Sequence, residues 1–146
     1  MRPPAALSSS LLRFRLRELL LVALGAVPGA WLRWQCGVLL GPRLGGVGVS
    51  DLLVNLAGSF LLGMLAGPVP QRSALLLFGG IGFCGSLTTF SGWLLEVLAL
   101  LRGGSAAAGW ALLLIAPLLG VAAAWLGLLA SRAWMRRWDS GRHNRR

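Results

Sequence analysis

Residues 82–93 read GFCGSLTTFSGW, a polar and glycine-rich stretch inside one of the most hydrophobic parts of the chain. Threonines, serines and aromatic rings gather there beside three glycines. Polar residues at membrane depth are costly, and irregular backbone is tolerated there only where it is buried in protein or lines a cavity. The stretch therefore predicts an interrupted membrane helix with an ion site at the interruption.

The composition of the whole chain indicates an integral membrane protein. The chain has 146 residues, of which 56% are hydrophobic and only 12% are charged. Soluble domains have a far more polar composition, and one of this length lacks the interior volume to bury so many apolar side chains. We therefore expect an all-α membrane protein.

Four apolar runs are long enough to cross a bilayer, which takes about 20 residues. They cover roughly residues 17–40, 51–66, 73–101 and 107–130. The connectors GPRLGGVGVS, GPVPQR and RGGS carry the glycine and proline typical of loops. We expect a four-helix transmembrane domain at 17–131, with its third helix broken, between basic tails at 1–16 and 132–146.

The charge distribution predicts an orientation. The net charge of +10 comes from arginine, since there is no lysine. Four arginines precede the first span and six follow the last; with Arg72 they make eleven on one side, against Arg43 and Arg102 on the other. Arginine marks the cytoplasmic side and meets anionic lipid there. We expect both termini in the cytoplasm, a multi-pass protein of the bacterial inner membrane, and no nucleic-acid partner, because the tails are short.

Glycines recur at the spacing of helix contacts. Gly25 with Gly29, and Gly63 with Gly67, are each four residues apart. Small residues at this interval let helix backbones approach closely in lipid. The pattern predicts tight packing of the spans, in an oligomer.

The second span carries a polar stripe. Asp51, Asn55 and Ser59 fall at i, i+4 and i+8, on one face of a helix. Hydrogen bonds between helices would explain such a stripe. An anion site is the alternative, because the asparagine amide offers two donors and suits a dehydrated anion better than a cation.

The third span supplies the elements of a site. Four glycines weaken the helix before SLTTF: Gly79, Gly80, Gly82 and Gly85. A break of this kind frees backbone carbonyls that can coordinate a cation. After it, Phe90, Trp93 and Glu96 follow near helical periodicity. Aromatic edges are positive and can face an anion, although ordinary packing explains the same spacing.

Two further charges lie within the spans. Arg33 can extend to an interface or set a positive potential near an anion entrance. Glu96 can cap a helix, pair with an arginine or line a vestibule. Spacing alone leaves these interpretations open.

Three motifs occur in order along the chain: GAVPGAWLRW around Arg33, LLVNLAGSFLLG around Asn55, and GFCGSLTTFSGW around Phe90. With the four-span plan, they resemble the small bacterial fluoride channels, the CrcB or Fluc family. The resemblance covers all four spans and leaves only the tails outside.

The resemblance implies an antiparallel, dual-topology dimer with two pores along the subunit interface. It implies that fluoride leaves the cell passively and that a structural sodium ion sits on the dimer axis, held by the backbone carbonyls of Gly85 and Thr88. Asn55 would donate to fluoride, while Phe90 and Trp93 would offer ring edges. The predicted fluoride path comprises Asn55, Phe90, Trp93, Ser59, Ser91, Arg33 and Glu96.

The chain departs from the family pattern at several positions. Asp51 stands where the family usually has threonine, and Gly92 replaces a hydroxyl residue. Trp93 replaces phenylalanine and Trp34 replaces tyrosine. A carboxylate at position 51 would repel fluoride unless it is protonated, paired or off the path.

The arginine bias bears on the dimer. A chain that inserts in both orientations should have nearly balanced flanks, whereas this one predicts a single orientation. We therefore expect one half of a heterodimer with an oppositely oriented paralogue and one degraded pore; a homodimer is the alternative.

Two other functions fit four short spans. A proton-coupled small multidrug exporter needs a membrane-embedded carboxylate in the first span, but Glu18 lies at its edge beside arginines. A non-conducting membrane scaffold would show no ion flux. An enzyme is not expected, since the sequence has no acid–base pair, no activated nucleophile and no phosphate-binding loop.

Overall fold

The structure is a computed structural model that describes residues 9–67 and 73–143. These residues form helices and no strand. The elements in order are α1 (Ser9–Leu44), α2 (Val47–Ala66), the π-helix η1 (Leu76–Cys84), α3 (Gly85–Leu87), α4 (Ser91–Arg102) and α5 (Ala106–His143). Segments long and apolar enough to cross a membrane cover Leu11–Leu44, Val47–Ala66, Leu76–Arg102 and Ala106–Arg137. The predicted four spans, with the third one broken, are confirmed.

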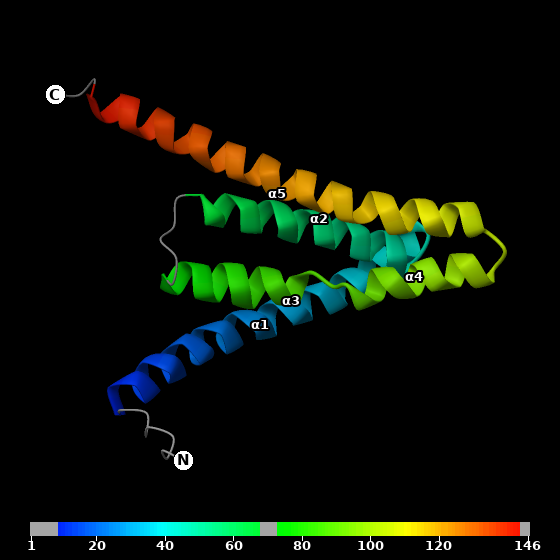
Figure 1. Ribbon diagram of the computed structural model, residues 1–146, viewed down its shortest axis with the longest axis horizontal. Coiled ribbons are helices and arrows are strands. Elements are labelled where there is room, and N and C mark those ends of the chain that lie inside the picture. Colours follow the sequence, from blue (N-terminus) through cyan, green and yellow to red (C-terminus); the bar gives the residue numbers. More distant parts are fainter. Residues whose placement is uncertain (1–8, 68–72, 144–146) are drawn as a thin grey trace, which may run out of the picture.

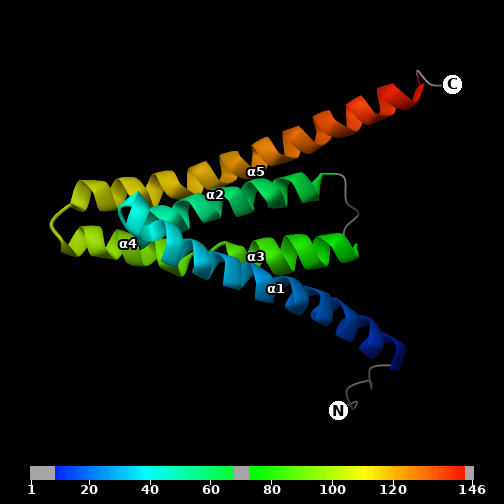
Figure 2. The same cartoon turned by 180° about the vertical axis from the view of Figure 1, so that it is seen from behind.

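Successive spans run in opposite directions along the bundle (Figures 1 and 2). The start of α1, the end of α2, the start of η1 and the end of α5 share one end of the molecule, and the two short turns occupy the other. This arrangement agrees with basic termini on a single side of the membrane. Which side that is stays a prediction.

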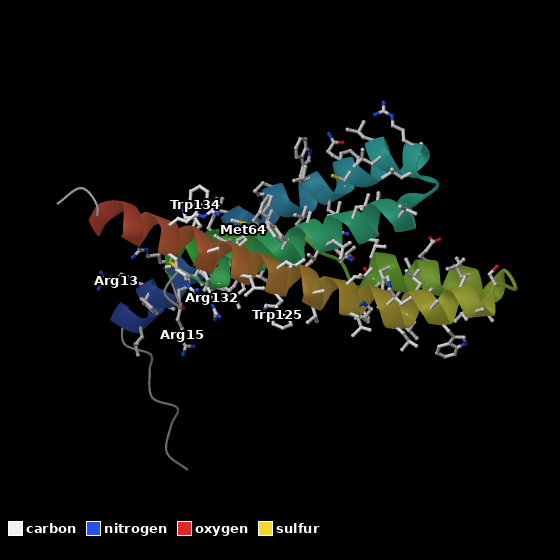
Figure 3. The ribbon with its side chains drawn as sticks, turned by 90° about the horizontal axis from the view of Figure 1, so that it is seen from above. Arg13, Arg15, Met64, Trp125, Arg132 and Trp134 are labelled. Carbon is white, nitrogen blue, oxygen red and sulfur yellow. The ribbon has the colours of Figure 1, made fainter. Side chains whose placement is uncertain are left out.

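The outer helices are longer than the sequence predicted. α1 begins at Ser9 and α5 continues to His143, so the expected boundaries at 16/17 and 131/132 fall inside helices. Arginine is a good helix former, and neither extension contains proline. Figure 3 shows Arg13, Arg15 and Arg132 near one end of the bundle, with Trp134 close by.

The first connector is shorter than expected. Residues 41–50 were predicted to form a loop, but only Gly45 and Gly46 lie outside the helices. Their φ angles are 87° and 144°, which glycine adopts readily. The Gly46 N–H donates to the Gly41 carbonyl at 2.9 Å. Two glycines thus suffice to reverse the chain.

Glycine contacts join the helices, as the spacing predicted. α2 packs most extensively on α5, and a Cβ atom at Gly63 would overlap the carbonyl oxygen of Ala124. In return, a Cβ atom at Gly127 would overlap the carbonyl oxygen of Phe60. Gly67 faces the Ser131 side chain. These backbones therefore touch at the separation that only glycine permits.

The same device fixes α1 against the broken span. Cβ atoms at Gly25 and Gly29 would overlap the carbonyl oxygens of Phe78 and Phe83 on η1. The buried apolar side chains are few and come mainly from segments around the break: Val54, Leu77, Cys84, Leu87, Trp93 and Val97. The small interior of the chain therefore surrounds the break.

Candidate ion site at the break in the third span

The break is held open by the side chain of Asn55. α3 ends at Leu87, and Thr88 adopts an extended conformation with φ −77° and ψ 148°. The Asn55 Nδ2 group donates to the Thr89 carbonyl at 2.8 Å, and the Thr89 N–H donates to Asn55 Oδ1 at 2.7 Å. The Asn55 amide therefore supplies hydrogen-bond partners for both the N–H and the carbonyl of Thr89, in place of the partners that a helix would provide. One of its two N–H donors remains for another acceptor.

This arrangement redirects the donors that a continuous helix would use. The Thr89 N–H would then donate to the Gly85 carbonyl, and the Gly92 N–H to the Thr88 carbonyl. Instead, Thr89 donates to Asn55, and Gly92 donates to Thr89 Oγ1 at 3.3 Å. Gly85 and Thr88 are thus released from their helical donors. The Thr88 hydroxyl donates to the Cys84 oxygen at 3.1 Å. The Gly85 oxygen is a second, longer acceptor of the same hydroxyl at 3.5 Å.

Arg33 binds the carbonyl oxygen of Ser86, which lies between Gly85 and Thr88 in the sequence. Its Nε donates to the Ser86 oxygen on α3 at 3.3 Å. The bond links α1 to the end of the broken helix and fixes one edge of the guanidinium group. Sequence spacing had left the role of Arg33 open between an interface and an anion entrance, and this anchoring contact was not predicted.

A groove of about 280 Å³ gathers four predicted path residues. Asn55, Ser59, Phe90 and Trp93 line it, together with Leu52, Leu56, Leu62, Thr88, Thr89, Ala116, Pro117 and Gly120. The rings of Phe90 and Trp93 are 5.0 Å apart between centroids and tilted by 59°. Phe90 is 70% exposed, whereas Trp93 is 6% exposed and its indole N–H donates to the Leu112 carbonyl at 3.4 Å. The groove thus combines an amide, a hydroxyl and two rings.

The other three predicted path residues do not line this groove. Ser91 is exposed, with its hydroxyl 3.2 Å from that of Thr89. Glu96 lies against the backbone of α2, where a Cβ atom at Gly48 would be 2.5 Å from its Cγ. Arg33 belongs to a different pocket. The sequence gives the periodicity of these residues but not the rotation of their helices.

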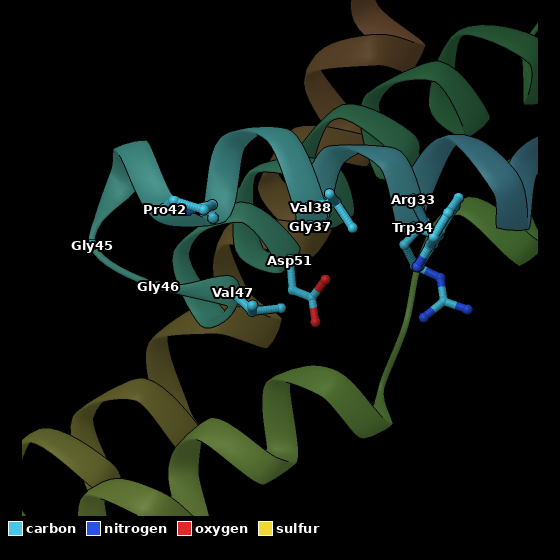
Figure 4. Close-up of a pocket in the computed structure, with 10 residues that line it drawn as sticks. Arg33, Trp34, Gly37, Val38, Pro42, Gly45, Gly46, Val47 and Asp51 are labelled. Carbon is cyan, nitrogen blue, oxygen red and sulfur yellow. The ribbon is translucent and has the colours of Figure 1, made fainter.

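That second pocket, of about 710 Å³, lies beside the Gly45–Gly46 turn. Asp51 and Arg33 reach it from α2 and α1 (Figure 4). A Cβ atom at Gly92 would overlap Oδ2 of Asp51, so the carboxylate fills the space that a side chain at position 92 would take. Asp51 and Gly92, at which the resemblance implied other residues, are therefore in contact with each other. The sequence analysis did not predict this contact.

Comparison with known proteins agrees with this architecture. A family model described as "CrcB-like protein, Camphor Resistance (CrcB)" matches residues 20–128. The chain belongs to this family. The CrcB match reaches into all four apolar segments and ends short of both termini.

Several relatives are similar over most of their length. The "Fluoride-specific ion channel FluC 2" of Parasynechococcus marenigrum (strain WH8102) is 50% identical over 124 residues, 84% of this chain and 87% of the relative. The "Fluoride-specific ion channel FluC" of Gloeobacter violaceus is 42% identical over 122 residues, 80% of this chain and 98% of the relative. That of Haemophilus ducreyi is 39% identical over 118 residues, 81% and 94% respectively.

The contact between Asp51 and Gly92 predicts a coupled pair of substitutions. Gly92→Ser should destabilise the protein by about 1–3 kcal/mol, because the new side chain meets the carboxylate. Asp51→Ser should relieve most of that loss, which heating curves of the purified variants would measure as a double-mutant cycle. Gly37→Ser is the matched control, since the nearest atom to its Cβ position is 3.8 Å away. If Gly92→Ser lowers the stability equally in the wild-type protein and in the Asp51→Ser variant, the contact between the two residues is contradicted.

Proposed function

We propose that the chain is a fluoride-selective ion channel that lets cytoplasmic fluoride leave the cell down its own gradient. It is a transport protein rather than an enzyme. The relatives named as fluoride-specific channels and the family match support this function. The structural observation that carries it is the groove in which Asn55 lies with the rings of Phe90 and Trp93.

Fluoride is small and tightly hydrated, so a pore must replace its water with short, well-aimed donors. The second N–H of Asn55 and the positive edge of the exposed Phe90 ring are donors of this kind. A pore narrow enough to hold fluoride between them would exclude the larger chloride ion. Export needs no energy input, because hydrogen fluoride leaks into cells and ionises at the higher internal pH, leaving a trapped anion that a passive pore releases.

An antiparallel dimer would complete the pore. Within one chain the groove is open, and Phe90 and Gly85 are exposed beside it. A second subunit placed over this face would enclose the path and bring two broken helices together. The partner is an oppositely oriented paralogue, because eleven arginines on one side against two fix a single orientation. The numeral in the name "FluC 2" of several relatives fits chains that occur in pairs.

The remaining path residues have subsidiary roles in this proposal. Ser59 lies in the groove. Ser91 is exposed with its hydroxyl beside that of Thr89, which lines the groove, and Arg33 and Glu96 would act on fluoride from outside it. Four apolar spans indicate a multi-pass protein of a bacterial membrane. We place it in the inner membrane with both termini in the cytoplasm, where the arginine-rich helix ends meet anionic lipid.

The backbone at the break suits a sodium ion. Gly85 and Thr88 are the two residues whose carbonyls lose their helical donors to Asn55 and Thr89. Carbonyl oxygens freed in this way are typical Na⁺ ligands in membrane proteins. When bound, the ion would supply positive charge that holds two broken helices together at the dimer axis.

Fluoride efflux from liposomes tests the function. The purified chain, alone and with its paralogue, should release fluoride measured with a fluoride electrode, while chloride is retained. Asn55→Asp should abolish efflux, because aspartate cannot donate to the Thr89 carbonyl or to an anion. Phe90→Ile should also abolish it, because the ring edge is lost.

The same assay separates the alternatives. Loss of transport in Glu18→Gln, with Asn55→Asp active, would favour the proton-coupled exporter. No flux with either assembly would favour the scaffold. Full activity of the chain alone would replace the heterodimer by a homodimer and leave the fluoride function intact.

Sodium dependence tests the cation site. Exhaustive replacement of Na⁺ by a large organic cation should lower efflux and dimer stability together, and Na⁺ should restore both. Thr89→Val should weaken the response, because Gly92 then loses its side-chain acceptor and can return to the Thr88 carbonyl. If fluoride efflux and dimer stability do not change when Na⁺ is replaced, the proposed sodium site is contradicted.

A further inference from the structure

The larger pocket holds a balanced pair of charges. Of its ten lining residues that the structure describes, Arg33 and Asp51 carry charge, and the others are apolar, glycine or tryptophan. Arg33 binds the Ser86 carbonyl through Nε alone, which leaves its other donors for the pocket. The Arg33 guanidinium and the Asp51 carboxylate thus lie on the lining of the same pocket. An arginine that would attract an anion is therefore offset by its neighbour.

The carboxylate is held firmly in this position. Asp51 is 7% exposed, and its Oδ2 occupies the notch left by Gly92 on α4. The notch exists because residue 92 has no side chain. A second carboxylate packs on a glycine between the same two helices. Here the carboxylate, Glu96, belongs to α4 and the glycine, Gly48, belongs to α2. The position of the Asp51 charge is thus set by helix packing.

Asp51 is also close to the anion site. It lies one helical turn before Asn55 on α2, an axial rise of about 6 Å. The Gly92 that it contacts donates to Thr89, the residue that Asn55 binds. A charge at this separation lies within the Debye length of about 10 Å at 0.1 M salt, so an anion at Asn55 experiences it.

We propose that Asp51 limits anion entry to the pore that this chain lines: seated in the Gly92 notch, its carboxylate offsets the positive potential that Arg33 would otherwise offer to fluoride approaching Asn55. The proposal rests on the fluoride function proposed above. It makes Asp51 and Gly92 determinants of conductance in this chain, with Asp51 acting from the neighbouring pocket on the groove that holds Asn55.

The test compares Asp51→Asn with wild type as fluoride efflux from neutral-lipid liposomes containing the assembled channel. Asparagine keeps the shape and removes the charge. Efflux should rise about tenfold, at the low end of the range for electrostatic effects on association rates. The gain should be larger near 0.01 M salt than near 1 M potassium glutamate, because salt screens the potential that fluoride meets as it approaches from solution, while the buried Asp51 carboxylate itself is screened less. A structural defect would not follow this dependence.

Two further variants complete the experiment. Glu18→Gln removes the same charge at the edge of the first span and should leave efflux unchanged at both salt concentrations. The double variant Asp51→Thr with Gly92→Ser refills the notch without charge and should also raise efflux, which keeps the test available if Asp51→Asn folds poorly. If neither Asp51 variant raises efflux above the wild-type rate, this inference alone is overturned. No fluoride efflux in any variant would overturn the proposed function and this inference with it.

Discussion

The structure depends on the pair of hydrogen bonds between the Asn55 amide and the backbone of Thr89. A break in a membrane helix leaves donors and acceptors without partners, and each unsatisfied group costs several kcal/mol in hydrocarbon. Asn55 satisfies one residue of the break from a neighbouring helix, and Arg33 satisfies the Ser86 carbonyl from another. The carbonyls of Gly85 and Thr88 lose the backbone donors of a continuous helix, and the Gly85 oxygen lies 3.5 Å from the Thr88 hydroxyl. One side chain thereby links the proposed anion donor to the proposed cation site.

This constraint explains the density of glycine around it. Asn55 can reach Thr89 only if α2 and the third span approach closely, and a Cβ atom at Gly58 would lie 2.6 Å from Cγ2 of Thr88. η1 is likewise pressed against α1 through Gly25 and Gly29. Van der Waals packing of this kind drives helix association in lipid, where the hydrophobic effect between helices is absent. The polar break therefore depends on tight backbone packing, because Asn55 reaches Thr89 only where the helices approach closely.

Much of this could be predicted from the sequence, because membrane spans and helix breaks have strong local signals. Hydrophobic length gave the four spans, and GFCGSLTTFSGW gave the break. Helix ends were less predictable: a two-glycine turn replaced a ten-residue loop, and arginine-rich ends stayed helical. The contact between Asp51 and Gly92 could not be predicted, because these residues are 41 positions apart and their contact depends on the rotation of two helices. The roles of Asn55, Phe90, Trp93 and the sodium site remain predictions.

Asn55 holds Thr89 with one edge of its amide, and we propose that it offers its remaining N–H to fluoride. The chain has two asparagines, Asn55 and Asn144, so ¹⁵N-asparagine labelling of this chain in the assembled channel yields two side-chain amide signals. Titration with fluoride, and separately with chloride, follows both by NMR. We expect that fluoride shifts the side-chain amide signal of Asn55, that the Asn144 signal does not change, and that chloride shifts neither signal. An Asn55 signal that ignores fluoride, or responds equally to chloride, would contradict it.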